Sequence, residues 1–211
     1  MTLSQETRAA CCNRSSEGGH KFVGKLEHSG EVTLVLGGAR SGKSRLAEAI
    51  IAEAVVARES QAAIYVATAE ARDEEMARRI AAHRERRGPN WRTLEIPLAL
   101  AQDLPDLLQS EDPVLVDCLT LWLSNIMLAE REAETEIGAL VTGLALARAP
   151  LVLVSNETGL GIVPDNALAR RFRDFSGVMN QQIAAVANNV LLVAAGLPLV
   201  MKGRNPAPNP I

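Results

Sequence analysis

The sequence predicts an α/β domain in which helices cover both faces of a mostly parallel β-sheet. Short apolar runs alternate with longer segments of helical periodicity from Val32 onward, as repeated strand–helix–strand units require. The runs at 114–116 and 151–154 are continuously apolar, which is typical of strands buried on both faces. Only 3% of the residues are aromatic, so the expected core is aliphatic.

Seven strands are expected, at 32–36, 62–68, 91–96, 113–117, 151–155, 190–194 and 199–202. The last of them is expected to be an antiparallel edge strand after a turn at 196–198. Helices are expected from the end of the first loop to about residue 57, and then at 70–87, 98–108, 119–128, 130–148 and 165–187. Pro105 should interrupt or kink its helix, and Asp165 should be the N-cap of the last one.

Composition divides the chain into one domain and two tails. We expect a disordered extension at 1–30, a folded domain at 31–203 and a flexible, proline-rich tail at 204–211. The net charge of −3 and the few aromatic residues argue against a nucleic-acid partner. No apolar stretch is long enough to span a membrane, and the three cysteines suggest neither a disulfide framework nor a zinc site. A cytoplasmic location is the simplest expectation.

A glycine-rich octet follows the first strand and fits the pattern G-x-x-x-x-G-K-[ST]. Its members are Gly37, Gly38, Ala39, Arg40, Ser41, Gly42, Lys43 and Ser44. A strand before it and a helix after it are the context in which this P-loop pattern binds phosphate. Backbone N–H groups and the positive end of the helix would face the phosphates, Lys43 would reach the β- and γ-phosphates, and Ser44 would ligate Mg²⁺. The alternative is a strand–helix turn that binds nothing.

Two further groups suggest phosphate chemistry. Asp117 ends an apolar strand downstream of the P-loop, the position at which a carboxylate helps to hold Mg²⁺, although a strand can also simply end in an acid. Six arginines lie within fifteen residues around His83. They could form a solvated helix face, or they could bind polyphosphate and keep a nucleophilic imidazole neutral.

A third polar segment, 154–164, directly follows the fifth strand. Loops beyond the carboxyl ends of parallel strands line the ligand crevice of an open sheet. The acid, amide and hydroxyl groups of this loop could therefore recognise a polar substrate. A glycine-rich connection without any such role is the alternative.

In their sequence and order, these motifs resemble those of the bifunctional adenosylcobinamide kinase/adenosylcobinamide-phosphate guanylyltransferases of cobalamin biosynthesis. The resemblance rests on 37–44, 65–69, His83-Arg84, 91–95, 117–120, 155–159, Arg173-Asp174 and Asn180-Gln181, and it covers residues 31 to 203. It implies a RecA-like P-loop fold. It also implies phosphorylation of adenosylcobinamide by ATP or GTP, followed by transfer of GMP from GTP to the new phosphate.

The resemblance also implies roles for individual residues. His83 would carry GMP covalently, Lys43 would act in catalysis, and Ser44 and Asp117 would bind Mg²⁺. Contacts to GTP would come from the octet together with Ala67, Thr68, Ala69, Arg84, Glu85, Arg86, Arg87, Glu95 and Asp117. A homotrimer is implied as well. A P-loop kinase for another small alcohol and a nucleotide-switched binding module are the alternative functions.

Overall fold

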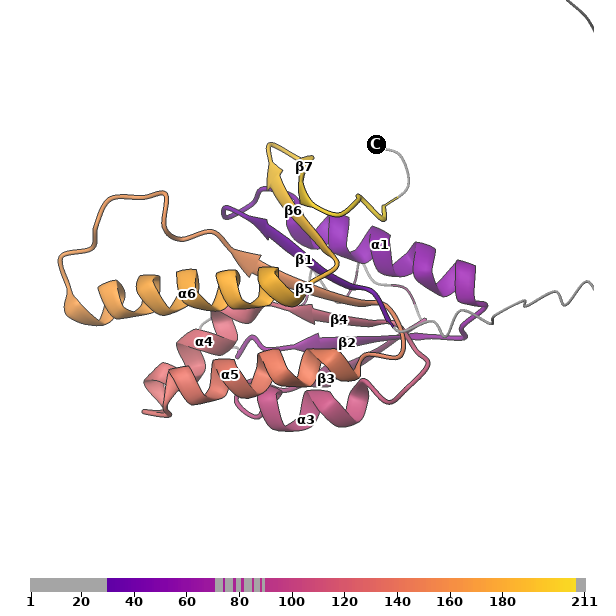
Figure 1. Ribbon diagram of the computed structural model, residues 1–211, viewed down its shortest axis with the longest axis horizontal. Coiled ribbons are helices and arrows are strands. Elements are labelled where there is room, and N and C mark those ends of the chain that lie inside the picture. Colours follow the sequence, from indigo (N-terminus) through magenta and orange to yellow (C-terminus); the bar gives the residue numbers. More distant parts are fainter. Residues whose placement is uncertain are drawn as a thin grey trace, which may run out of the picture.

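A seven-stranded sheet forms the centre of the protein (Figure 1). The computed structural model describes residues 30–70, 74, 78, 81, 85, 88 and 90–207. The strands are β1 (Val32–Gly37), β2 (Ala63–Ala67), β3 (Trp91–Glu95), β4 (Val114–Asp117), β5 (Leu151–Asn156), β6 (Asn189–Ala194) and β7 (Leu197–Lys202). They lie in the order β3-β2-β4-β5-β1-β6-β7. All neighbours are parallel except β6 and β7, which confirms the predicted α/β class and the antiparallel edge strand.

Helices cover both faces of the sheet, as predicted (Figure 1). They are α1 (Lys43–Arg58), α3 (Leu100–Leu107), α4 (Leu119–Leu128), α5 (Ala133–Gly143) and α6 (Ala167–Val186), with a 3₁₀ turn at Leu144–Leu146. Alternate residues along each strand face opposite sides, so the sheet has two apolar cores. One core packs beneath α1, and the other packs against α3, α4, α5 and α6. None of the described helices has the length and apolar character that a membrane span needs.

Three details differ from the expectation. The helix expected at 98–108 is not interrupted at Pro105, since α3 continues through this residue, and the alternative of a kink there stays a prediction. Asn166, rather than Asp165, is the N-cap of α6, and its side-chain oxygen accepts a hydrogen bond of 2.8 Å from the backbone N–H of Ala169. The segment 130–148 contains a shorter helix, α5, whose first turn begins at Ala133.

The turn between β6 and β7 also differs from the expectation. It is a two-residue hairpin loop at Ala195 and Gly196, whereas a turn at 196–198 was expected. Ala195 and Gly196 both have positive φ values, 52° and 82°. Positive φ at both central residues is the geometry that matches the twist of a tight hairpin. The strand β7 therefore begins at Leu197, two residues earlier than expected.

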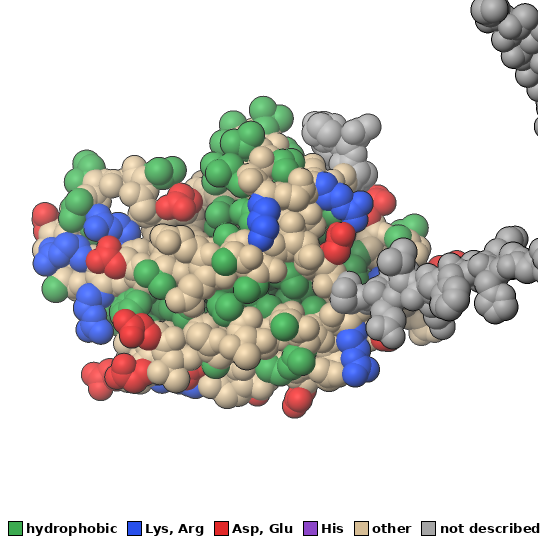
Figure 2. Space-filling model, in the orientation of Figure 1, with side chains coloured by type: hydrophobic (Ala, Val, Ile, Leu, Met, Phe, Trp, Pro, Cys, Tyr) green, Lys and Arg blue, Asp and Glu red, His purple; other side chains and the backbone are tan. Residues whose placement is uncertain are grey.

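The edge strand β7 carries exposed apolar side chains. Leu197, Leu199 and Met201 are each about 60% exposed, at 65%, 59% and 61%, and Val200 is 43% exposed. Figure 2 shows hydrophobic side chains gathered over the β6–β7 hairpin. Contiguous exposed apolar groups of this kind are typical of surfaces that bind another molecule.

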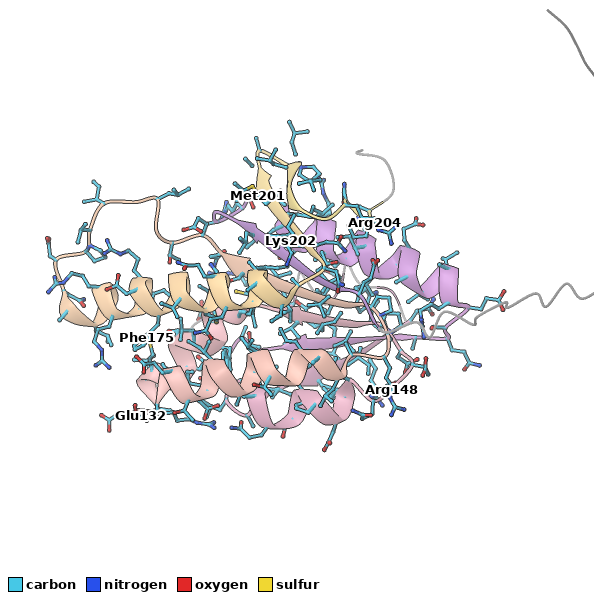
Figure 3. The ribbon with its side chains drawn as sticks, in the orientation of Figure 1. Glu132, Arg148, Phe175, Met201, Lys202 and Arg204 are labelled. Atoms are coloured by element: carbon cyan, nitrogen blue, oxygen red, sulfur yellow. The ribbon has the colours of Figure 1, made fainter. Side chains whose placement is uncertain are left out.

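Side chains at the end of β7 attach this strand to the rest of the fold (Figure 3). Nζ of Lys202 donates to the carbonyl oxygens of Ala184 and Ala185 at 3.0 and 2.9 Å, in the last turn of α6. A cation there satisfies carbonyl groups that have no partner within the helix. Arg204 forms an ion pair of 2.9 Å with Glu31, directly before β1.

Candidate functional site

The parallel register places the candidate acids at one edge of the sheet. Ala67, which ends β2, pairs with Asp117 on one side and with Glu95 on the other. Tyr65 and Leu115 lie two residues earlier on their strands, and both pack into the core beneath α1. Because side chains alternate along a strand, Asp117 and Glu95 project on the α1 face. Sequence positions up to 50 residues apart thus meet in one row.

The glycine-rich octet joins β1 to α1 at the same edge. A Cβ atom on Gly37 would lie only 2.6 Å from Oγ of Ser41 and from the carbonyl oxygen of Val193, so no larger residue fits there. Gly42 has a φ of 99° and is the N-cap of α1, and no side chain caps this helix. Its first N–H groups therefore lack a side-chain cap, and uncapped N–H groups of this kind bind anions at helix N-termini.

Two polar groups of the octet are buried, the amine of Lys43 and the hydroxyl of Ser41, whereas Arg40 is exposed. Lys43 is only 8% exposed, and its Nζ donates to the carbonyl oxygen of Gly38 at 3.0 Å. Oγ of Ser41 is buried, and among the described residues it has no hydrogen-bond partner. The backbone oxygen of Ser41 accepts from the N–H of Gly196, so the β6–β7 turn supports the loop. An unpaired buried hydroxyl and a helix without a cap fit a loop that binds an anion.

Asp117 is held by a neighbouring strand. The phenol of Tyr65 donates to Oδ2 of Asp117 across 3.1 Å, and Tyr65 is itself 4% exposed. Its ring meets Trp91 edge-on, with centroids 6.1 Å apart and an interplanar angle of 78°. This leaves Oδ1 of Asp117 for another partner. Tyr65 was not predicted from the sequence to have a role, although it places a hydroxyl in an otherwise apolar strand, two residues before Ala67.

The segment 67–69 is fastened to the end of β4. The hydroxyl of Thr68 donates to the carbonyl oxygen of Cys118 at 2.7 Å and accepts from its N–H at 2.8 Å. The side chain of Asn125 donates to the carbonyl oxygen of Thr68 at 2.8 Å. Thr68 is completely buried, whereas Ala67 and Ala69 are half-buried. The side chain of Thr68 therefore positions the segment, and its two neighbours reach the surface.

Cys118 is a buried free thiol beside the candidate site. Burial raises the pKa of this thiol, and the negative charge of Asp117 raises it further. Hydrogen bonds with Thr120 act in the opposite direction but are weaker causes. The neutral thiol is thus the stable form, which makes Cys118 a poor nucleophile.

The arginine-rich segment is described only in part. Glu74, Arg78, Ala81 and Glu85 are helical and exposed, in agreement with the helix expected at 70–87. Arg78 and Glu74 form an exposed ion pair of 3.5 Å. His83, Arg84, Arg86 and Arg87 lie outside the described residues, as do Cys11, Cys12 and the rest of 1–29.

The two predicted metal ligands, Ser44 and Asp117, suit Mg²⁺ better than a metal that is coordinated entirely by protein side chains. Ser44 and Asp117 offer a hydroxyl and a carboxylate, and oxygen is the ligand atom that Mg²⁺ prefers. The described part of the chain contains no cluster of three or more His, Cys, Asp or Glu side chains able to hold a metal ion. Mg²⁺ commonly takes one or two protein ligands and completes its shell with water and substrate phosphates. The two candidate ligands therefore fit a nucleotide-bound Mg²⁺.

Comparison with known proteins extends over almost all of the described sheet. The family model for cobinamide kinase / cobinamide phosphate guanyltransferase matches residues 33–201. The bifunctional adenosylcobalamin biosynthesis protein CobP of Pseudomonas aeruginosa is 49% identical over 172 residues, covering 81% of this chain and 96% of that protein. The bifunctional proteins CobU of Salmonella typhimurium and Escherichia coli are 40% and 39% identical over 184 residues, covering 80% of this chain and 98% of each relative.

Proposed function

Because the chain belongs to the cobinamide kinase / cobinamide phosphate guanyltransferase family and is therefore a transferase, we propose that it catalyses both reactions on adenosylcobinamide in cobalamin biosynthesis. In the first, the substrate hydroxyl attacks the γ-phosphorus of ATP or GTP, its proton is released, and the nucleoside diphosphate leaves. In the second, GMP passes from GTP to the new phosphate, giving adenosylcobinamide-GDP and pyrophosphate.

The P-loop at the start of α1 is the observation that carries this proposal. Backbone N–H groups of 37–44 and Nζ of Lys43 would bind the triphosphate, since the helix end has no side-chain cap. The remaining contacts would come from Ala67, Thr68, Ala69, Arg84, Glu85, Arg86, Arg87, Glu95 and Asp117. The row formed by Ala67, Glu95 and Asp117 on the α1 face supports this assignment.

Ser44 and Asp117 would hold Mg²⁺ against the phosphates. The bound ion would neutralise negative charge on the phosphate oxygens as it builds up during transfer. The hydrogen bond from Tyr65 fixes one oxygen of Asp117 and so restricts the orientation of the carboxylate. In phosphoryl transfer, such positioning and charge stabilisation supply most of the catalysis.

His83 is the proposed carrier of GMP. A ring nitrogen attacks the α-phosphorus of GTP, pyrophosphate leaves, and a phosphorus–nitrogen bond forms. An oxygen of the adenosylcobinamide phosphate then attacks the same phosphorus, which breaks that bond and restores the imidazole. Splitting one displacement into two easier steps is the advantage of covalent catalysis. Arg84, Arg86 and Arg87 would stabilise the charge on the attacked phosphate.

Labelling with GTP radioactive at the α-phosphate tests the proposal. The wild-type protein should acquire an acid-labile, hydroxylamine-resistant label that is lost when adenosylcobinamide phosphate is added. His83→Ala should remain unlabelled while keeping measurable phosphorylation of adenosylcobinamide, and His20→Ala, which precedes the residues matched by the family model, serves as the matched control. Unlabelled wild-type protein would exclude the carrier role and favour a kinase for another alcohol. GTP binding without any transfer would favour a nucleotide-switched binding module.

Two further parts of the proposal concern the setting of the enzyme. We expect a homotrimer, and the exposed apolar side chains of β7 support self-association (Figure 2). Light scattering coupled to size-exclusion chromatography measures the mass directly, and a monomer would contradict this expectation. A cytoplasmic location is expected as well, where both nucleotides are available.

A further inference from the structure

Asn156 lies between the two strands that carry the proposed phosphate and metal groups. The strand β5 separates β1, which leads into the P-loop, from β4, which ends in Asp117. Asn156 is the last residue of β5 and pairs with Gly37, the first residue of the P-loop. Val152 and Val154 pack beneath α1, so alternation places the side chain of Asn156 on the same face.

The backbone of Asn156 is fixed by side chains of two helices. Its N–H donates to the hydroxyl of Thr120 in α4 at 2.9 Å. Its carbonyl oxygen accepts from the amide of Asn180 in α6 at 3.2 Å, and Asn180 is held in turn by the buried hydroxyl of Ser155 at 2.7 Å. The next residue, Glu157, donates its N–H to the carbonyl oxygen of Gly37. Asn156 is thus held rigidly against the P-loop strand.

The amide side chain of Asn156, by contrast, is almost unused. Its Nδ2 lies 4.0 Å from Sγ of Cys118, which is a weak contact for a good donor. Among the described residues, Oδ1 of Asn156 makes no hydrogen bond. The half-buried amide therefore keeps its hydrogen-bonding capacity while its backbone is anchored. A rigidly held but unsatisfied polar group is expected where a ligand completes its bonding.

We propose that Nδ2 of Asn156 donates a hydrogen bond to the terminal phosphate of the bound nucleotide and so distinguishes a triphosphate from a diphosphate. The inference rests on the proposed nucleotide-binding site and adds a residue to it. Lys43 would approach the phosphates from α1 and Asp117 from β4, and β5 lies between β4 and β1, so the end of β5 would face the terminal phosphate. A neutral amide can donate there without adding a negative charge beside the phosphate oxygens.

Binding of fluorescent derivatives of GDP and of a non-hydrolysable GTP analogue tests this assignment. Asn156→Ala should weaken binding of the triphosphate about tenfold or more, the effect of losing a hydrogen bond to a charged group. It should leave GDP binding within twofold. Asn156→Asp has nearly the same shape but brings a negative charge, so triphosphate binding should fall further. Asn166→Asp is the matched control, because aspartate caps a helix as well as asparagine does.

The outcomes separate this inference from the proposed function. If Lys43→Ala no longer binds GDP or the GTP analogue while Asn156→Ala binds both like the wild type, nucleotide binding at the P-loop is supported and the role of Asn156 is refuted. Equal weakening of GDP and triphosphate by Asn156→Ala would also overturn the proposal, because it would indicate a structural effect. If Lys43→Ala binds both nucleotides like the wild type, the proposed nucleotide-binding site at the P-loop is itself refuted. Thermal unfolding of Asn156→Asp, which preserves the side-chain shape, confirms that the variant is folded.

Discussion

The phenol of Tyr65 donates a hydrogen bond to Oδ2 of Asp117 from the adjacent strand, across 3.1 Å. The two residues are 52 positions apart in the sequence. The bond occupies one carboxylate oxygen and leaves the other for a further partner. Tyr65 would therefore act through Asp117, as a positioning residue for the metal proposed there.

Tyr65→Phe should raise the Mg²⁺ concentration needed for half-maximal nucleotide binding. Groups that orient a metal ligand typically contribute about tenfold in metal affinity, and Phe keeps the ring but removes the donor. Titrating Mg²⁺ against a fluorescent GTP analogue measures the shift, with nucleotide binding in excess EDTA as the reference. Trp91→Phe is the control, because the ring of Trp91 packs edge-on against the ring of Tyr65. A Mg²⁺ dependence identical to the wild type would show that Asp117 needs no such support.

Lys43→Ala should lose phosphorylation of adenosylcobinamide by about 100-fold or more, because one charged donor to the transferring phosphate is removed. A coupled assay for nucleoside diphosphate release measures the rate. Lys202→Ala is the matched control, since Lys202 binds carbonyl oxygens at the end of α6. It should lower stability slightly and leave the rate unchanged. Retained phosphorylation in Lys43→Ala would contradict the role of the P-loop.

Asn166→Ala should lower the free energy of unfolding by about 1 kcal/mol, the usual contribution of a side-chain N-cap. The side chain of Asn166 accepts from the N–H of Ala169, whereas among the described residues that of Asp165 makes no hydrogen bond. Asp165→Ala should therefore have little effect, and Asn166→Asp should be nearly neutral. Urea unfolding followed by circular dichroism measures all three variants. A larger loss of unfolding free energy in Asp165→Ala than in Asn166→Ala would show that Asp165 is the N-cap.

Cys118 should react with thiol reagents only when the protein unfolds. Burial and the charge of Asp117 raise the pKa of the thiol above its ordinary value of 9.0. In a Cys11→Ser/Cys12→Ser protein, Cys118 is the single remaining cysteine. Its labelling rate at pH 8 should match the rate of unfolding, while denatured protein should react at once. Fast labelling of the native protein would indicate an accessible thiolate.

The same thiol predicts a direction for stability against pH. Because the pKa is higher in the folded state, the unfolded chain loses the thiol proton first as the pH rises above about 9. This group's contribution to stability is therefore fully present below pH 9 and decreases above it. The free energy of unfolding of the wild type should fall more steeply than that of Cys118→Ala over this range. Parallel curves would contradict the raised pKa.

The sequence by itself determined the α/β class, the alternation of strands and helices, and the position of the glycine-rich octet between β1 and α1. These are local properties, because apolar periodicity and glycine at fixed spacing act over a few residues. Local signals were less reliable at boundaries. The choice between Asp165 and Asn166 as a cap depends on the path of the chain into α6, and the hairpin at Ala195 and Gly196 lacks a strong turn dipeptide.

Only the tertiary structure decided which strands are neighbours, and with them the composition of the candidate site. The order β3-β2-β4-β5-β1-β6-β7 brings Tyr65 to Asp117, Thr68 to Cys118 and Asn156 to Gly37. Each pair joins strands or strand ends that are separated by at least one helix in the sequence. Pairing of this kind arises from packing two apolar cores on a twisted sheet, and that packing is a property of the whole chain and of no single segment.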